Sequence, residues 1–321
     1  MINRKVVFMS AQPDTQYFHW QVEVLINNFL SLGINPNWIE VLWAHDGNPS
    51  YALLNLAQRY PSVRFFYYPK TVINNFGYIP ILRPDILEQH FRKYPLLRGE
   101  VIFYHDSDII FRELPEFDSI HSDHFWYLSD TRSYIGSNYI RSKSEDLFID
   151  LCNLSNIEPG LVRQNEEVSG GAQYLMKGVT SDFWQVVKKD SLALYKFMVD
   201  REIQERTNLQ NSGQDMTHYN PIQKWCADMW AVLWTAWKFG VQTKLTSEFD
   251  FSWGTSTLDT YNSLKIMHNA GVTEDLKSTY FYKGEYIGKS PFNADLSYVD
   301  PNTASAKYVD AILYAKSTRP S

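Results

Sequence analysis

Residues 101–112, VIFYHDSDIIFR, decide the fold that this sequence predicts. Four mostly apolar residues, Val101–Tyr104, predict a buried strand, and the polar run His105-Asp106-Ser107-Asp108 follows before Ile109–Phe111 restores the apolar character. Two carboxylates two residues apart at the end of an apolar strand repel each other unless a cation, a proton or basic side chains compensate them. Magnesium and manganese prefer carboxylate oxygens and leave coordination positions free for phosphate. The motif therefore favours a metal site, and a solvated turn is the alternative.

Composition narrows the class of protein. The 321 residues are enough for one large α/β domain with extensions. A formal net charge of −6 disfavours a nucleic-acid partner, because such proteins depend on a basic surface. Cys152 and Cys226 lie far apart, in two predicted helices, and suggest neither a zinc site nor a disulfide framework. With no long apolar run, the sequence predicts a cytoplasmic protein without an integral membrane segment.

Strands and helices alternate through the first half of the chain. Apolar runs predict strands at residues 6–9, 39–44, 63–68, 101–104 and 125–128. Helical spacing predicts helices at residues 17–32, 51–60 and 84–94. Residues 10–14 are small or turn-forming and are expected to end the first strand. This alternation predicts βαβ units and a mostly parallel central sheet flanked by helices. Ligands bind beyond the carboxyl ends of such strands, so Ala11, Asp46 and Asp106 are expected at one edge.

The second half carries weaker signals. Ser142 and Glu145 form a capping-box pattern for a helix through residue 154. Gly170 and Gly171 allow the close approach of either a ligand or another strand. Helices are expected at residues 181–199 and 220–239, with a polar loop or lid at 201–219.

Two polar residues of the second half allow a structural or a functional interpretation. Asp228 lies beside the apolar stripe of the last predicted helix, where a salt bridge with Lys224 is the structural alternative. His268 follows a short apolar run, and a lone histidine is more often a hydrogen-bonded structural residue than a metal ligand. Neither residue decides a function alone.

The order of these features resembles the GT-A glycosyltransferases, in particular glycogenin-like and galactosyltransferase-like enzymes that use nucleotide sugars. The resemblance covers residues 3 to about 290 as a set of short motifs. It implies a Rossmann-like single domain over residues 1–321, with a nucleotide-sugar-binding half to about residue 130. An acceptor-binding half with a C-terminal extension follows. Asp106 and Asp108, with Ser107 between them, would hold manganese or magnesium at the donor diphosphate.

The same resemblance assigns further roles. Arg83 opens a helix where a basic residue contacts the donor, and His268 in IMHNAG resembles a third metal ligand. Ala11 and Asp46 are expected near the nucleobase. The set expected at the sugar and acceptor pocket is Gly170, Gly171 and Trp225. The basic residue that follows the histidine in the family is missing at its usual distance, which leaves Lys283 or Lys289 as distant substitutes.

The resemblance implies metal-dependent transfer of a hexose or pentose from a UDP-sugar or a GDP-sugar to a hydroxyl group, as on a glycan. Asp228 matches the family's acidic residue only loosely; it would deprotonate the acceptor or stabilise an oxocarbenium-like sugar. Retention and inversion both stay open. A haloacid-dehalogenase-type phosphohydrolase also carries Asp-x-Asp, but after its first strand, whereas three βα units precede the motif here. A non-catalytic sugar- or nucleotide-binding protein is the remaining alternative.

Overall fold

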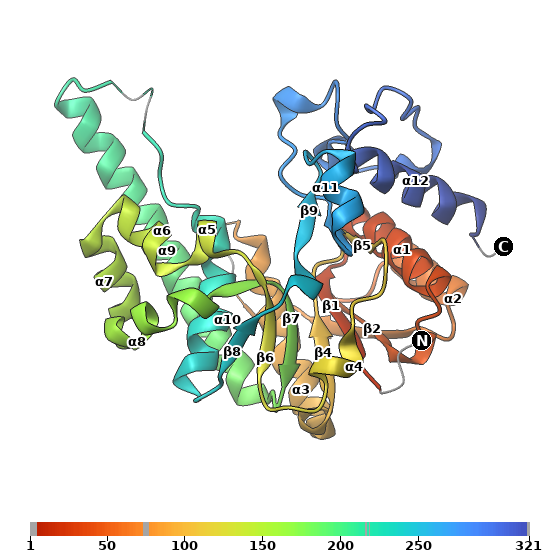
Figure 1. Ribbon diagram of the computed structural model, residues 1–321, viewed down its shortest axis with the longest axis horizontal. Helices are drawn as coiled ribbons and strands as arrows, with labels where there is room; N and C mark the ends of the chain where they lie inside the picture. The colour runs from red at the N-terminus through yellow and green to blue at the C-terminus, as the bar shows by residue number, and fades with distance from the viewer. Residues whose placement is uncertain (1–4, 73–76, 216, 218, 320–321) are drawn as a thin grey trace.

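The computed structural model describes residues 5–72, 77–215, 217 and 219–319, and its centre is a seven-stranded sheet (Figure 1). Across the sheet the strands are β3 (Arg64–Pro69), β2 (Ile39–His45), β1 (Val7–Pro13), β4 (Val101–Tyr104), β7 (Gly170–Lys177), β6 (Trp126–Asp130) and β8 (Thr243–Leu245). Neighbours are parallel except where β7 pairs with β4 and with β6. The predicted α/β fold with a mostly parallel sheet is confirmed.

Helices cover both faces of this sheet. They are α1 (Gln16–Ser31), α2 (Tyr51–Arg59), α3 (Leu82–Lys93), α4 (Phe117–Ile120), α5 (Arg132–Ile135), α6 (Ser137–Lys143), α7 (Glu145–Leu154), α8 (Pro159–Gln164), α9 (Ser181–Asn211), α10 (Ala227–Lys238), α11 (Leu258–Ser263) and α12 (Ala304–Ser317). Alternate strand residues point to opposite faces. Val7 and Met9 of β1 belong to an apolar core shared with α3, α9 and α10, and Phe8 belongs to a second core shared with α1 and α2.

A small second sheet brings the C-terminal third of the chain against the centre. It consists of β5 (Ile109–Phe111), β10 (Ile266–His268) and β9 (Phe251–Trp253), in that order. Strand β10 is antiparallel to β5 and parallel to β9. Because β5 begins directly after Asp108, this sheet places distant residues beside the turn that follows β4.

The first strand is longer than predicted. Residues 10–14 were expected to end it, but β1 continues to Pro13 and stays paired with β2 throughout, with Ala11 opposite Leu42 and Pro13 opposite Ala44. The buried amide of Gln12 donates from Nε2 to the Leu42 carbonyl oxygen at 2.8 Å. Small and polar residues remain extended here because a neighbouring strand satisfies their polar groups.

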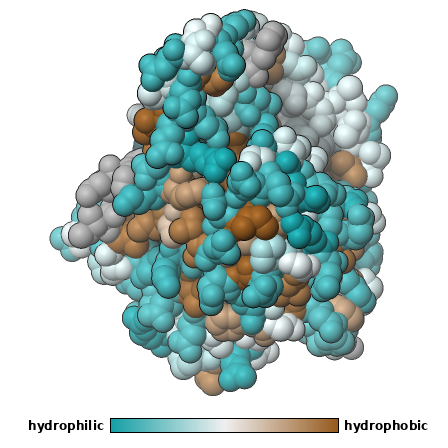
Figure 2. Space-filling model, turned by 90° about the vertical axis from the view of Figure 1, so that its left-hand side faces the viewer, coloured by the Kyte–Doolittle hydropathy of each residue, from teal (hydrophilic) through white to brown (hydrophobic). Residues whose placement is uncertain are grey.

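The predicted loop or lid at residues 201–219 is wrong for its first half, because α9 continues to Asn211. This polar turn of helix carries i,i+4 ion pairs, Arg201 with Glu205 at 2.9 Å and Arg206 with Glu202 at 2.8 Å. Such pairs stabilise a helix without an apolar stripe. Helix α9 projects from the body (Figure 1), and the face on this side of the molecule is largely hydrophilic with small hydrophobic patches (Figure 2). Residues 216 and 218 lie outside the described part.

Two predicted helix starts are corrected. The capping box of Ser142 with Glu145 is wrong: Ser142 lies within α6, and Ser144 caps α7 by accepting the Leu147 N–H at 3.3 Å. The helix expected from residue 220 starts later, at Ala227, after a 3₁₀ turn at Lys224–Cys226. Both errors are shifts of a boundary and leave the element itself in place.

The C-terminal segment packs on the N-terminal half. Helix α12 lies beside α1 (Figure 1), and Trp20 shares an apolar core with Tyr308 and Ile312. Cys152 and Cys226 are buried free thiols. Among the described residues, no helix is both long and apolar enough to span a bilayer.

Candidate functional site

Strand register explains how the candidate metal ligands meet. The His105 N–H still bonds the Met9 carbonyl oxygen at 3.1 Å, and the chain then turns through Asp106–Asp108 into β5. Strand β10 pairs with β5 so that His268 lies opposite Ile109. The next residue, Asn269, donates its N–H to the Asp108 carbonyl oxygen at 2.9 Å. Backbone pairing therefore fixes the histidine beside the carboxylates.

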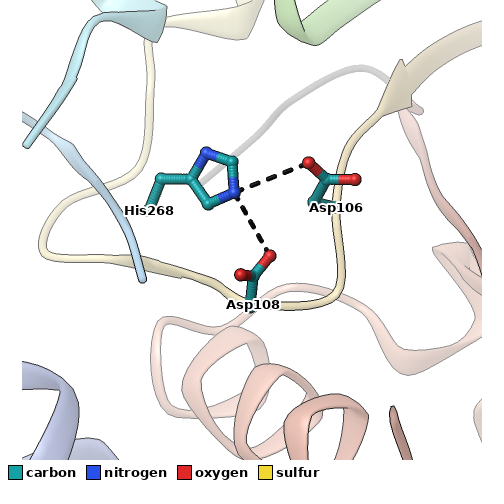
Figure 3. A group of neighbouring side chains, drawn as sticks. All are labelled: Asp106, Asp108 and His268. Carbon is teal, nitrogen blue, oxygen red and sulfur yellow. Dashed lines mark ion pairs between the residues drawn. The ribbon is translucent and has the colours of Figure 1, made fainter. Parts of the chain in front are cut away.

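The three side chains converge on one point (Figure 3). His268 Nε2 lies 3.2 Å from Asp108 Oδ1 and 3.5 Å from Asp106 Oδ2. One ligand atom from each residue lies within 4.8 Å of the others, and they form the one such group among the described residues. Two carboxylate oxygens and an imidazole nitrogen suit a divalent ion such as Mn²⁺ or Mg²⁺. The donor set thus fits the metal that the motif predicts.

Lys283 adds a positive charge to this group. It comes from a 3₁₀ helix at Lys283–Tyr286 and forms an ion pair with Asp108 Oδ2. Burial raises the pKa of Asp108, but Lys283 and His268 more than offset this effect and hold that pKa well below its ordinary value. The distant lysine therefore lies in the site. Lys289 lies instead over the Tyr286 ring, with Nζ 5.3 Å from the ring centroid.

Arg83 connects the candidate metal ligands to a third carboxylate. Its Nη1 lies 2.8 Å from Asp106 Oδ1 and 3.4 Å from Asp228 Oδ2. The residue belongs to the first turn of α3, and its side chain also hydrogen-bonds Tyr104, the last residue of β4. Burial lowers the pKa of Arg83, but the charges of Asp106 and Asp228 raise this pKa by more than burial lowers it. The net shift is upward, and the guanidinium stays charged.

Asp228 is a buried carboxylate in the first turn of α10. Its Oδ1 accepts a hydrogen bond from the Tyr78 hydroxyl at 3.1 Å. Burial raises its pKa, Arg83 lowers it and Asp106 raises it, with a net upward shift. The alternative interpretation, a salt bridge with Lys224, is wrong, because Lys224 pairs with Glu202 on α9.

These residues line a cavity of about 650 Å³. Two further predicted residues lie on its wall, Ser107 and Trp225. Trp225 is 53% exposed, so part of its ring is free to meet a flat apolar surface. The sequence analysis missed two residues of this wall, Tyr17 and Trp253, and also Tyr78, which is buried beside Asp228. The Trp253 ring stacks on His268 at 6.0 Å between centroids, because β9 pairs with β10. The signal that could have indicated Trp253 is its place as an aromatic residue at the end of a short strand, β9.

Five predicted residues lie outside this cavity wall. Ala11 is buried in the core, and Asp46 pairs with Lys70 at 2.5 Å with an 81% exposed side chain. Lys289 is exposed. The remaining two are Gly170 and Gly171.

The two glycines are needed for packing. A Cβ on Gly170 would lie 2.3 Å from the Ser129 carbonyl oxygen of β6, and one on Gly171 would lie 2.3 Å from the Tyr174 hydroxyl. Another strand and a side chain, rather than open cavity, face these positions. The small residue that lines the cavity is the next one, Ala172, which has a φ of +70°.

No protein-family model and no curated protein matches the chain. It resembles solved structures of glycosyltransferases. With the bifunctional glycosyltransferase WbbM the identity is 12% and the TM-score 0.46, over 98% of this chain but only 50% of the WbbM chain. With the galactosyltransferase LgtC, in complex with donor and acceptor sugar analogues, the values are 11% and 0.44, over 95% and 94% of the two chains. With mouse xyloside xylosyltransferase 1 the identity is 9% and the TM-score 0.39, over 82% of this chain and 96% of the other. Likeness at this level carries no conclusion about activity.

Proposed function

We propose that the protein transfers a sugar from a nucleoside diphosphate sugar to an acceptor hydroxyl, with Mn²⁺ or Mg²⁺ held by Asp106, Asp108 and His268. The observation that supports this most is the convergence of these three ligands on the wall of one cavity, between the cations of Arg83 and Lys283. A nucleoside diphosphate carries negative charge that grows as the glycosidic bond breaks. A site with ligands for a divalent ion and two fixed cations suits such a leaving group.

A bound metal would supply Lewis-acid stabilisation of the departing diphosphate. The chain's own residues would do the rest. Lys283 pairs with Asp108, and Arg83 pairs with Asp106. Each cation can therefore donate hydrogen bonds to phosphate oxygens beside its own aspartate. Ser107, buried between the two aspartates, lies on the wall beside them.

Asp228 is the proposed catalytic carboxylate. It lies on the wall that also carries the exposed Trp225, where we place the acceptor. Its raised pKa brings it closer to the range in which a carboxylate accepts a proton from a hydroxyl. It would serve either as that base or as a negative charge against the oxocarbenium-like sugar, and the two roles correspond to different stereochemical outcomes.

The donor is proposed to be a UDP-sugar, with a GDP-sugar second and a glycan as acceptor, from the resemblance to glycogenin-like and galactosyltransferase-like enzymes. Asp46 follows β2 at the same sheet edge as Asp106 and remains a proposed nucleobase contact. The side chain of Ala11 is buried. The neighbouring wall residues Pro13 and Tyr17 are therefore better placed than Ala11 to contact the nucleobase. The proposed location remains the cytoplasm.

A thermal-shift screen of UDP-, GDP-, CMP- and dTDP-sugars with and without Mn²⁺ tests this function, because a ligand of the folded state raises the melting temperature. We expect a metal-dependent rise with one nucleotide class, followed by release of that nucleoside diphosphate on incubation. Asp106→Asn, Asp108→Asn and His268→Ala are each expected to lower the Mn²⁺ affinity at least tenfold. Asp259→Asn, an exposed carboxylate on α11, is the control.

Other outcomes identify the alternatives. Unchanged Mn²⁺ affinity and turnover in Asp106→Asn and Asp108→Asn would remove the central assignment. Release of phosphate from a simple phosphoester without a nucleotide sugar would indicate a phosphohydrolase. Metal-dependent binding without turnover over many hours would indicate a non-catalytic binding protein.

A further inference from the structure

One buried hydroxyl contacts both ends of the proposed catalytic residue. The backbone N–H of Asp228 donates to the Tyr78 hydroxyl oxygen at 2.9 Å, and this hydroxyl lies 3.1 Å from Asp228 Oδ1, to which it donates in turn. The same hydroxyl is 3.3 Å from the Trp225 carbonyl oxygen, a second acceptor for its one proton. The phenol therefore links the start of α10 to the carboxylate that this start carries.

Packing fixes the ring that presents this hydroxyl. Tyr78 is fully buried, directly before the 3₁₀ helix Ile79–Ile81. Its ring stacks on Tyr195 of α9, with 4.0 Å between centroids and 16° between planes, and meets Trp225 edge-on at 5.6 Å. Contacts on two sides leave the ring little rotational freedom, so the hydroxyl oxygen is held at one place.

We infer that Tyr78 is a positioning residue that holds the Asp228 carboxylate toward the cavity. This inference rests on the proposed function, in which Asp228 acts on the acceptor or on the sugar. A carboxylate bonded on one oxygen by Tyr78 and approached on the other by Arg83 keeps one rotamer. A catalytic carboxylate supports the full reaction rate when it is held within a fraction of an ångström of its productive position, and the rate falls when the carboxylate is free to move.

The two contacts of the hydroxyl with Asp228, and not the stacking, distinguish a tyrosine from a phenylalanine at this position. Phenylalanine would fill the same space between Tyr195 and Trp225 and leave the core intact. It would remove the oxygen that Asp228 contacts twice. The hydroxyl remains a donor throughout the working pH range, because burial and the charge of Asp228 raise the pKa of Tyr78 well above its ordinary value.

Tyr78→Phe in the full-length protein is the direct test, with Tyr195→Phe as its matched control. Tyr195→Phe removes a hydroxyl from the other ring of the same stack. We expect Tyr78→Phe to lower the kcat for release of UDP from UDP-galactose or UDP-glucose at least tenfold, with the donor KM within about twofold of the wild-type value. The Asp228→Asn, Tyr78→Phe double variant is expected to be no slower than Asp228→Asn, because Tyr78 acts through Asp228.

A measurement without turnover keeps the two hypotheses apart. Carboxyl ¹³C NMR of aspartate-labelled, metal-free protein observes Asp228 directly, with Asp228→Asn identifying its resonance. The Tyr78 hydrogen bond lowers the pKa of Asp228, so Tyr78→Phe should move its titration midpoint to higher pH and Tyr195→Phe should not. An unmoved resonance, or a kcat equal to that of Tyr195→Phe while Asp228→Asn is inactive, would overturn the inference about Tyr78 alone. Absence of nucleotide-sugar turnover by the wild-type protein, with the resonance shifted as expected, would overturn only the proposed function.

Discussion

At the scale of single residues, the site depends on how buried carboxylates are compensated. Asp108 is 5% exposed and is paired with Lys283 on one oxygen and His268 on the other. Without these partners its burial would favour the neutral form. The depressed pKa of Asp108 shows that its partners exceed the cost of burial. Charge balance at this residue therefore links the site to the stability of the protein.

Lys283→Met, studied in the metal-free protein, tests how much the Lys283 charge contributes to stability through Asp108. A carboxylate with a lowered folded-state pKa stabilises the fold above its unfolded pKa of about 4, and this stabilisation is lost as the pH falls through the folded-state pKa. Loss of Lys283 raises the pKa of Asp108, so we expect the free energy of unfolding at pH 7 to fall by about 1–3 kcal/mol. The deficit should shrink toward pH 3, because the Asp108 carboxyl of the variant, with its raised pKa, becomes protonated there and no longer needs a cation. Urea unfolding at several pH values measures it.

Lys277→Met is the control for this experiment. Lys277 pairs with Glu274 and Glu285 at the surface, with a 44% exposed side chain, so its loss should leave the free energy of unfolding nearly unchanged. An equal deficit for Lys283→Met at pH 7 and at pH 3 would show that Lys283 acts through packing and not through the charge of Asp108.

At the scale of elements, local patterns predicted the kind of element better than its length. The strand before Asp106 and the βαβ order followed from apolar runs, which local sequence contains. The ends of β1 and α9 did not, because Gln12 and the Arg201–Glu205 pair are satisfied by tertiary or helical partners that polarity alone hides. Tyr78 was missed for the same reason: its partner lies 150 positions later in the chain.

The start of α7 offers an element-scale test. Ser144 accepts the Leu147 N–H, so Ser144→Ala should lower the free energy of unfolding by about 1 kcal/mol. Ser142→Ala removes the serine that the capping-box pattern favoured. Its hydroxyl donates to the Tyr139 carbonyl oxygen within α6 and does not cap α7, so we expect a change within about 0.5 kcal/mol. Urea titrations compare the stabilities of the two variants. A larger loss of stability for Ser142→Ala than for Ser144→Ala would favour the capping box of Ser142 with Glu145.

At the scale of the whole molecule, the two ends of the chain are parts of one body. The parts of the chain before and after about residue 130 share the central sheet, since β4 pairs with both β1 and β7. The C-terminal helix α12 shares a core with α1, and Lys283, from the segment before α12, pairs with Asp108 of the candidate metal site. The single-domain organisation predicted for residues 1–321 therefore has a physical consequence: the site and the C-terminal segment should unfold together.

Glu23 is the residue that tests this coupling. Its side chain is 2% exposed on α1 and binds Arg59 of α2 at 2.9 Å and Arg319, beyond α12, at 2.6 Å. Glu23→Gln leaves two guanidiniums without their carboxylate and should lower the free energy of unfolding by about 1.5–3 kcal/mol. Glu274→Gln, whose carboxylate is 75% exposed, should change it little. In a single domain, tryptophan fluorescence and circular dichroism should shift together along one urea transition. An early transition for part of the signal, with the main midpoint unchanged, would show instead that the C-terminal segment unfolds separately from the body that holds Asp106 and Asp108.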